Sequence, residues 1–207
     1  RDSSMRVQGR KILFLGIARP DTGLDLVLKA LPLVRRRLGN VSLKIVGPSN
    51  AVVEGLKRLA ADSGLEAFLE CAGVCDRAAF ETLFSDCYCG VNLVADPNSY
   101  SSRVIPAKVW DYLQYLLPVL VTAYVGPTAE TIRERRIGLV TAPDTDAVAS
   151  ALIELFEERS ACVQNIQRFL RTRSSTGLVQ LLCPDASGHG SPAANAAADM
   201  AGDEGKR

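Results

Sequence analysis

The sequence predicts an α/β fold, a doubly wound, Rossmann-like parallel sheet of about six strands. Three observations carry this prediction. Short apolar runs alternate with segments of helical periodicity along most of the 207 residues. The runs at 43–46 and 119–121 are almost continuously apolar, as expected of strands buried on both faces. Turn and capping residues separate the two kinds of segment, so each strand is followed by a helix rather than by a hairpin.

The first half of the chain is predicted to form three strand–helix units. The expected strands are the apolar runs at 11–15, 41–46 and 68–72. The helices expected after them are 24–38, a segment that ends at Gly64, and 76–85. The first helix shows apolar residues at i, i+3, i+4 and i+7 and ends at Gly39-Asn40. Polar caps, Ser49 or Asn50 and then Asp76, open the other two helices.

The second half repeats this pattern. Its expected strands are 88–95, 118–122 and 139–141. Pro106 suits the first turn of the next helix, because its missing N–H would be unpaired there in any residue. A short helix should follow Thr128, and Asp144 should cap the last core helix.

We expect four segments along the chain: 1–10 as a leader or linker, 11–159 as the Rossmann-like domain, 160–183 as a terminal amphipathic helical segment, and 184–207 as a disordered tail. The terminal segment groups Ile166, Phe169 and Leu170 into an apolar stripe. Since we expect nothing in the domain to cover this stripe, we predict a mobile or loosely docked segment. The tail has almost none of the large apolar residues that folding requires.

Composition excludes several classes of function. A net charge of +1 provides no global field for nucleic acid. The sequence contains no apolar run of about 18 residues, so no membrane-spanning helix is expected. The six cysteines are too scattered for a disulfide framework. The chain starts at Arg1 rather than Met, which suggests a fragment, a mature product or an excised domain. It shows no signal-peptide pattern, so we expect a reduced, cytoplasmic-side domain.

Residue types exclude further chemistry. The single histidine, His189, lies in the predicted tail, so Ser-His-Asp hydrolysis and His-ligated metal sites are not expected in the domain. The P-loop and the dinucleotide-binding glycine fingerprint are both missing. The pairs Cys71-x3-Cys75 and Cys87-x-Cys89 could form a zinc cluster, but their strand positions and spacing favour buried core cysteines.

A parallel sheet of this kind binds its ligand beyond the carboxyl ends of its strands. The candidate loops follow Leu15, Val46, Ala72, Ala95 and Thr122. The loop after Ala95 enters the helix at Pro106, whose free first-turn N–H groups and dipole favour an anion. Arg103 and Lys108 flank this helix end, where the dipole disfavours a cation unless an anion is bound. Asp111, one turn after Lys108, is placed to accept hydrogen bonds from ribose hydroxyls.

A simpler interpretation stays open for the same residues. Arg103 and Lys108 are then solvated side chains, and Asp111 forms a helix-surface pair with Lys108.

One block of sequence carries a resemblance to a known family. Pro106-x-Lys108-x-x-Asp111-Tyr112-Leu113, followed by Leu-Pro-Val-Leu-Val-Thr at 117–122, resembles the donor-site block of GT-B-fold retaining glycosyltransferases of the group 1 type. Their usual text is Pro-x-Lys-x-x-Glu-Tyr-Leu-Ala-x-Gly-x-Pro-Val-Val-x-Thr. Weaker similar blocks follow in family order at 14–16, 23–31, 43–47, 72–74, 126–130 and 138–144. The resemblance covers 11–158 and implies the C-terminal, donor-binding domain of such an enzyme.

The resemblance also implies roles for individual residues. Arg103, Lys108 and the helix terminus would stabilise the departing diphosphate of a nucleoside-diphosphate sugar, without a metal ion or other cofactor. Asp111 would hold the ribose, and the Gly73–Val74 backbone would hold the base. The remaining donor-binding residues implied by the family are Gly16, Arg19, Gly47, Ser101, Ser102 and Ala107.

The sequence departs from the family pattern at several positions. Ile17 and Thr22 stand where many relatives carry an Arg and a Lys that grip diphosphate, and Arg19 is the nearby cation that could substitute. Arg103 replaces the first acid of the family's Glu-x7-Glu pair, and the second is shortened to Asp111. Leu116-Leu117 replaces the usual small residue and glycine before the proline. These departures leave open a non-catalytic member of the family.

The function implied is transfer of a sugar to an acceptor, in polysaccharide or glycoconjugate assembly, with retention of anomeric configuration. The acceptor would be held by an N-terminal domain or chain that this sequence lacks, and peripheral association with the inner face of the membrane would occur through that half. Two alternatives remain: a non-catalytic nucleotide-binding or scaffold domain, and a sugar-nucleotide epimerase.

Overall fold

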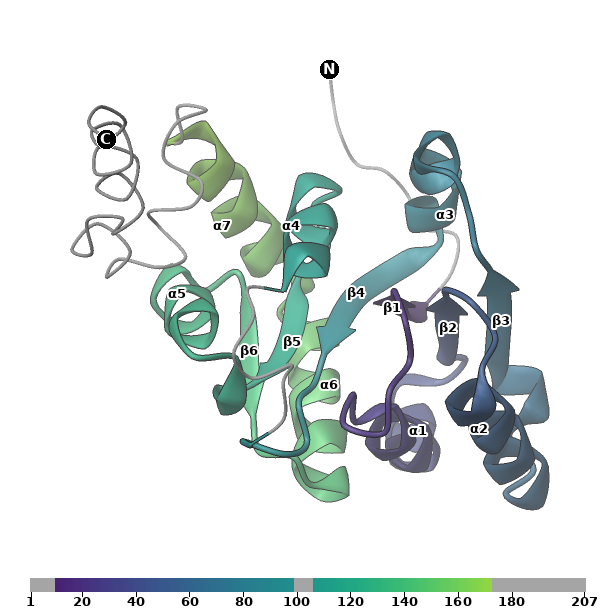
Figure 1. Ribbon diagram of the computed structural model, residues 1–207. Helices are drawn as coiled ribbons and strands as arrows, with labels where there is room; N and C mark the ends of the chain where they lie inside the picture. Colours follow the sequence, from purple (N-terminus) through teal and green to yellow (C-terminus); the bar gives the residue numbers. More distant parts are fainter. Residues whose placement is uncertain (1–9, 99–105, 173–207) are drawn as a thin grey trace, which may run out of the picture.

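The computed structural model describes residues 10–98 and 106–172, and it confirms the predicted sheet. Six parallel strands form one sheet in the order β3-β2-β1-β4-β5-β6 (Figure 1). The strands are β1 (Lys11–Leu15), β2 (Ser42–Val46), β3 (Leu69–Gly73), β4 (Cys87–Asn92), β5 (Val119–Thr122) and β6 (Gly138–Thr141). This order places a topological switch point between β1 and β4, where the chain changes direction across the sheet.

Helices cover both faces of the sheet (Figure 1). One face carries α1 (Leu24–Leu38), α2 (Ala51–Asp62) and α6 (Thr145–Glu157). The other carries α3 (Phe80–Ser85), α4 (Ala107–Gln114), α5 (Pro127–Arg135) and α7 (Arg159–Arg171). Short 3₁₀ turns lie at η1 (Glu66–Phe68), η2 (Arg77–Ala79) and η4 (Ala123–Val125). Each face buries its own apolar cluster, so the strands between them are apolar on both sides.

Most predicted helix boundaries are confirmed, and two caps differ. The side chains of Asn50 and Asp144 accept hydrogen bonds from the first backbone N–H groups of α2 and α6, as expected of caps. Asp76 makes no such bond, because the chain first forms η2 and enters α3 only at Phe80. Pro106 stands at the cap position itself, so α4 begins one residue later.

Strand β4 is shorter than predicted. It ends at Asn92, although Leu93 and Val94 are buried and continue the apolar run. The backbone of Val94 instead pairs with the hydroxyl of Thr122, which accepts from its N–H and donates to its carbonyl oxygen at 3.0 Å each. A side chain thus replaces the strand partner at this point.

The prediction for the terminal segment is wrong within the described residues. Ile166 and Phe169 of α7 are buried in the same cluster as α4 and α5, and Leu170 packs against that cluster. The Phe169 ring stacks on Trp110 of α4, with ring centroids 6.2 Å apart. The domain itself therefore covers the apolar stripe. Residues 173–183 and the predicted tail at 184–207 lie outside the described residues.

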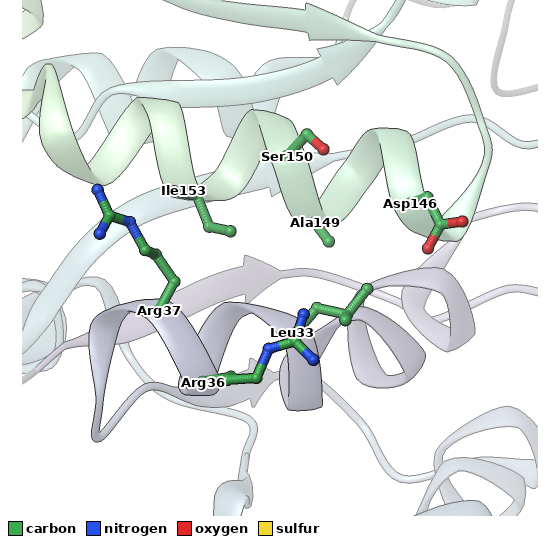
Figure 2. A pocket seen from close by; sticks show the side chains of 7 residues that line it. All are labelled: Leu33, Arg36, Arg37, Asp146, Ala149, Ser150 and Ile153. Carbon is green, nitrogen blue, oxygen red and sulfur yellow. The ribbon is translucent and has the colours of Figure 1, made fainter.

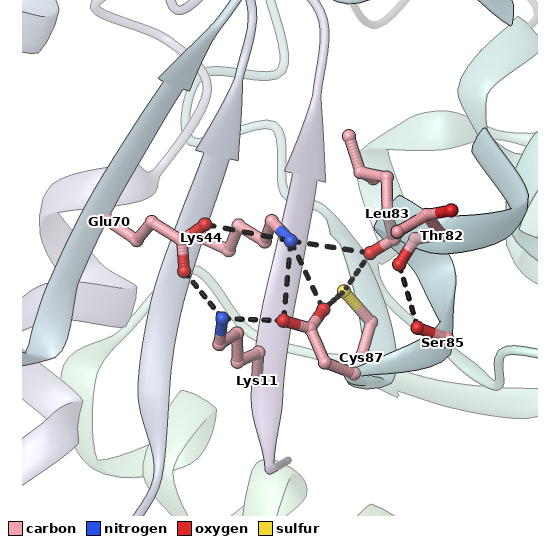
Figure 3. A network of polar contacts seen from close by, with 8 residues as sticks. Lys11, Lys44, Glu70, Thr82, Leu83, Ser85 and Cys87 are labelled. Atoms are coloured by element: carbon pink, nitrogen blue, oxygen red, sulfur yellow. Dashed lines mark hydrogen bonds and ion pairs between the residues drawn. The ribbon is translucent and has the colours of Figure 1, made fainter. Parts of the chain in front are cut away.

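A cluster of four charged side chains links β1, β2 and β3 with the residue that precedes β4 (Figure 3). Lys11 of β1 contacts Glu70 of β3 at 2.6 Å and Asp86, just before β4, at 2.5 Å. The buried Lys44 of β2 lies 3.1 Å from Asp86 and 3.6 Å from Glu70. Burial would raise the pKa of Asp86, but hydrogen bonds from Lys11 and Lys44 outweigh it and hold that pKa below its ordinary value. Two cations and two carboxylates thus satisfy one another at the amino-terminal side of the sheet.

Among the helices of 10–98 and 106–172, none combines the length and the hydrophobicity that a membrane span requires.

Candidate functional site

The strand ends beside the switch point are joined by backbone hydrogen bonds. Gly16 N–H donates to Val46 C=O, and Gly47 N–H donates to Gly73 C=O, both at 2.8 Å. A Cβ on Gly47 would lie 2.0 Å from the carbonyl oxygen of Gly16, so only glycine allows this approach. The predicted site residues Gly16, Gly47 and Gly73 are therefore adjacent at the carboxyl edge of the sheet.

Lys108 of α4 reaches across to this edge. Its Cε and Nζ would each lie 3.7 Å from a Cβ at Gly16, which has the left-handed φ of 118°. Its ammonium group also lies 4.2 Å from the ring centroid of the buried Phe14, a cation–π contact. Within the described part of the chain, no carboxylate forms an ion pair with this lysine and no acceptor hydrogen-bonds it.

The electrostatic surroundings of Lys108 favour an anionic ligand. Burial, and then the positive charge of Arg19, lower the pKa of Lys108 to about 8, and the negative charge of Asp21 opposes this only in part. Such a lysine gains from an anion that replaces the lost solvation. Lys108 is thus half-buried rather than fully solvated, and its role in donor binding stays a prediction.

The amino terminus of α4 provides a second attraction for an anion. Among the described residues, no side chain caps this end, where Pro106 stands. Val109 N–H donates to Pro106 C=O at 2.9 Å. The N–H groups of Ala107 and Lys108 have no acceptor among the residues that the structure describes. Free N–H groups and the positive end of the helix dipole together form a typical phosphate-binding arrangement.

Asp111 lies on α4 one turn beyond Lys108, and its side chain is 22% exposed. The predicted helix-surface pair with Lys108 does not form, because that lysine turns toward Gly16 and Phe14. Asp111 instead faces the 74%-exposed Arg77, with guanidinium and carboxylate 3.7 Å apart. Burial raises the pKa of Asp111, and Arg77 partly opposes that rise. The carboxylate is therefore held by one loose, solvent-accessible contact.

Two large apolar side chains are exposed at the same edge. Val74, after β3, is 76% exposed and Ile17, after β1, is 53% exposed, and they are the most prominent apolar side chains on the described surface. Each directly follows a strand-end glycine, so both stand beside the joined loops. An apolar rim of this kind suits the flat face of a nucleotide base.

The remaining predicted residues divide into two groups. Arg19 lies exposed in the loop after β1, close enough to Lys108 to lower its pKa. Thr22, at a position where relatives carry a lysine, is buried, and its hydroxyl donates to Arg19 C=O at 2.6 Å. Ser101, Ser102 and Arg103 fall in 99–105, outside the described residues, so their predicted roles stay predictions.

Four residues around the candidate site were not predicted from the sequence: Phe14, Asp21, Arg77 and Tyr112. The Phe14 ring contacts the Lys108 ammonium group. For Tyr112, the sequence offered one indication, its i, i+4 helical spacing from Lys108. Arg77 gave no signal, because no local pattern links residue 77 to residue 111.

A surface groove lies elsewhere on the domain. It has a volume of about 530 Å³ and runs between α1 and α6, lined by Leu33, Arg36, Arg37, Asp146, Ala149, Ser150 and Ile153 (Figure 2). No residue of the strand-end loops lines it. The zinc interpretation also finds no support: Cys87 and Cys89 are buried in β4, and burial raises the pKa of both thiols.

Comparison with known proteins assigns the family. A family model described as "Glycosyl transferases group 1" matches residues 9–158, more than half of the chain. The chain belongs to this family. Membership favours a glycosyltransferase over the epimerase and scaffold alternatives. No curated protein sequence gives a significant match.

Solved structures with the same fold include other members of the group. The C-terminal domain of LpcC, a glycosyl transferase group 1 family protein from Francisella tularensis, aligns with a TM-score of 0.64 at 16% identity, over 80% of this chain and 85% of that one. WaaG, a glycosyltransferase involved in lipopolysaccharide biosynthesis, aligns with a TM-score of 0.65 at 18% identity, over 85% of this chain and 46% of that one. HepE from Anabaena, in complex with UDP and glucose, gives 0.60 at 18% identity, over 82% and 45%.

These similarities confirm the expected GT-B C-terminal fold. The chain spans about half the length of WaaG and HepE but most of the isolated LpcC domain.

Proposed function

We propose that this chain is the donor-binding half of a glycosyltransferase that uses a nucleoside-diphosphate sugar. The observation that carries the proposal is the half-buried ammonium group of Lys108, which lies between Gly16 and the amino terminus of α4 and has no ion-pair partner among the described residues. The diphosphate would lie between these groups, with the ribose on Asp111 and the base against the Gly73–Val74 rim.

In the proposed reaction, the bond between the anomeric carbon and the diphosphate oxygen breaks, and its electron pair stays on the diphosphate. The acceptor hydroxyl oxygen bonds to the anomeric carbon and loses its proton. Lys108 and the dipole of α4 stabilise the negative charge that develops on the leaving group, and Arg103 is expected to assist. Because these cations provide the stabilisation, we propose that no metal ion is required. Excess EDTA should then leave the transfer activity unchanged once the proposed N-terminal half has been supplied.

The acceptor would be held by a separate N-terminal domain or chain facing the carboxyl edge of the sheet. Support comes from the coverage: the chain matches less than half of WaaG and of HepE. We further propose a role in polysaccharide or glycoconjugate assembly in the cytoplasm, with peripheral association at the inner face of the membrane through that other half.

The test is nucleotide binding by calorimetry. UDP, GDP and ADP should be tried in turn, and at least one should bind with micromolar to millimolar affinity. Lys108→Ala should weaken that binding by about 1–3 kcal/mol, the range for a hydrogen bond to a charged group. Lys29→Ala is the matched control, because Lys29 pairs with Asp25 on the exposed side of α1. Equal affinities for wild type and Lys108→Ala would contradict the assignment.

A further inference from the structure

Tyr112 is a fully buried polar side chain near the proposed site. It lies on α4 with 0% exposure, and its ring rests on Gly90 of β4. A Cβ at Gly90 would lie 2.4 Å from the ring, so the missing side chain of that glycine creates the space for the tyrosine. A fully buried hydroxyl needs hydrogen-bond partners, and their identity shows what the residue holds together.

The hydroxyl of Tyr112 bridges the switch point. It accepts a hydrogen bond from Leu15 N–H at 2.8 Å and donates one to Val91 C=O at 3.3 Å. The pairing of β1 with β4 ends at Leu13 and Gly90, so the two strands diverge before they reach Leu15 and Val91. The Tyr112 hydroxyl therefore links the two strands beyond the end of their backbone pairing. Burial raises the pKa of this hydroxyl, which stays protonated and able to donate.

The two ends of this bridge carry the proposed diphosphate site. Gly16 follows Leu15 directly, and Lys108 precedes Tyr112 by one helical turn on the same face of α4. We propose that Tyr112 is a positioning residue that sets the spacing between the Gly16 loop and Lys108, and so the fit of the donor diphosphate. This inference rests on the proposed function of the site.

Tyr112→Phe tests the inference, because it keeps the buried ring and removes only the hydroxyl. Leu15 N–H then loses its acceptor, and the Gly16 loop is free to shift away from Lys108. Affinity for UDP, GDP or ADP, whichever the wild type binds, should fall about three- to tenfold, as expected for one or two neutral hydrogen bonds. Affinity for the corresponding nucleoside should change less than twofold. Tyr115→Phe is the matched control on the same helix: its ring stacks on Phe84, and no hydrogen bond of its hydroxyl is found in the described structure.

A double-mutant cycle with Lys108→Ala separates positioning from general loss of stability. If Tyr112 acts through the spacing to Lys108, the double variant should bind the diphosphate no more than about twofold more weakly than Lys108→Ala alone. Losses that multiply, or a Tyr112→Phe variant that binds like Tyr115→Phe, would overturn the positioning role. Failure of the wild type to bind any of the three diphosphates would instead overturn the donor site itself. All affinities should be measured well below the melting temperature of the least stable variant, so that every variant is folded.

Discussion

At the residue scale, the proposed site centres on a lysine that lies half-buried over an aromatic ring. Phe14 and Gly16 lie beside the Lys108 ammonium group and offer it no counter-charge. Arg19 adds a second positive charge nearby, and the pKa of Lys108 falls to about 8. Its protonation therefore changes within an accessible pH range, and binding should change with it.

Diphosphate binding should weaken as the pH rises above about 8. The free protein loses the Lys108 proton there, whereas a bound diphosphate favours the charged form, so affinity should fall by up to about tenfold per pH unit. Calorimetry between pH 7 and 9.5 measures this. Lys108→Arg should show a flat profile, because a guanidinium stays charged over the whole range. A flat wild-type profile would show that the lysine does not contact the diphosphate.

Asp111 should discriminate ribose from deoxyribose. Asp111→Asn replaces one acceptor oxygen with a donor, so it should weaken binding of a ribonucleoside diphosphate by about 1–2 kcal/mol and hardly affect the 2′,3′-dideoxy analogue. Arg77→Ala is the control: it removes the exposed ion pair, keeps the carboxylate, and should preserve the discrimination. Equal losses with both nucleotides would make Asp111 a surface residue that only pairs with Arg77.

At the element scale, two helix ends on the α4–α5 side use left-handed residues other than glycine. Leu116, after α4, has φ 57°, and Arg136, after α5, has φ 51°. Leu116 belongs to the Leu116-Leu117 pair that departs from the family's glycine-containing text, and its positive φ is one that glycine adopts more readily than leucine does.

Arg136→Gly should stabilise the domain by about 0.5–1 kcal/mol, because an exposed residue at a left-handed C-cap costs free energy that glycine does not. Urea unfolding measures the change. Arg135→Gly, one residue earlier and inside α5, should instead destabilise by about 1 kcal/mol. A destabilised Arg136→Gly variant would show that the arginine side chain itself stabilises this end.

Ion pairs among Lys11, Lys44, Glu70 and Asp86 connect neighbouring strands and should stabilise the sheet. Asp86→Asn should cost about 2–3 kcal/mol, less than for a fully buried pair, because Lys11 and Asp86 are each about one quarter exposed. Asp25→Asn, which breaks the exposed pair with Lys29, should cost no more than about 0.5 kcal/mol.

The Asp86 contribution also depends on pH in a defined direction. Since the folded-state pKa of Asp86 lies below its ordinary value of 3.8, the stabilisation is present above that value and disappears as the pH falls through the folded-state pKa. The difference in unfolding free energy between wild type and Asp86→Asn should therefore shrink under acid. A constant difference would show that the cluster acts through packing alone.

At the scale of the whole molecule, the chain forms one wall of the proposed active site. Its buried apolar residues form one cluster on each face of its own sheet. Helix α7 packs against this domain through Ile166 and Phe169. The strand-end edge exposes Ile17 and Val74 on the described surface, and it is the part that would face the proposed second domain.

We predict that the chain alone binds a nucleoside diphosphate but transfers no sugar. Transfer requires an acceptor held opposite the donor, and the proposed N-terminal half should restore it when fused or added as a separate chain. Release of nucleoside diphosphate from a nucleotide sugar in the presence of acceptor measures this. A Lys108→Ala variant of the restored enzyme is the control and should lose most of the activity. Robust transfer by the isolated chain would contradict the two-domain proposal.

The sequence by itself determined the fold class, the six strands and most helix boundaries. Apolar periodicity reports local burial, and caps such as Asn50 and Asp144 act on the N–H groups next to them, so both can be found in a window of a few residues. The same local information placed Lys108 at a helix terminus. Errors arose where a side chain or a turn competed with the regular element, as at Thr122 beside Val94 and at Asp76 before η2.

Only the tertiary structure decided which distant residues meet. It turned Lys108 toward Phe14, set Arg77 beside Asp111, placed the Tyr112 hydroxyl between diverging strands, and covered the stripe of α7 with Trp110. These partners are separated by tens of residues, and their approach depends on the order of strands in the sheet and on the length of each pairing. A pattern of burial along the chain states that a side chain is covered, but the topology selects what covers it.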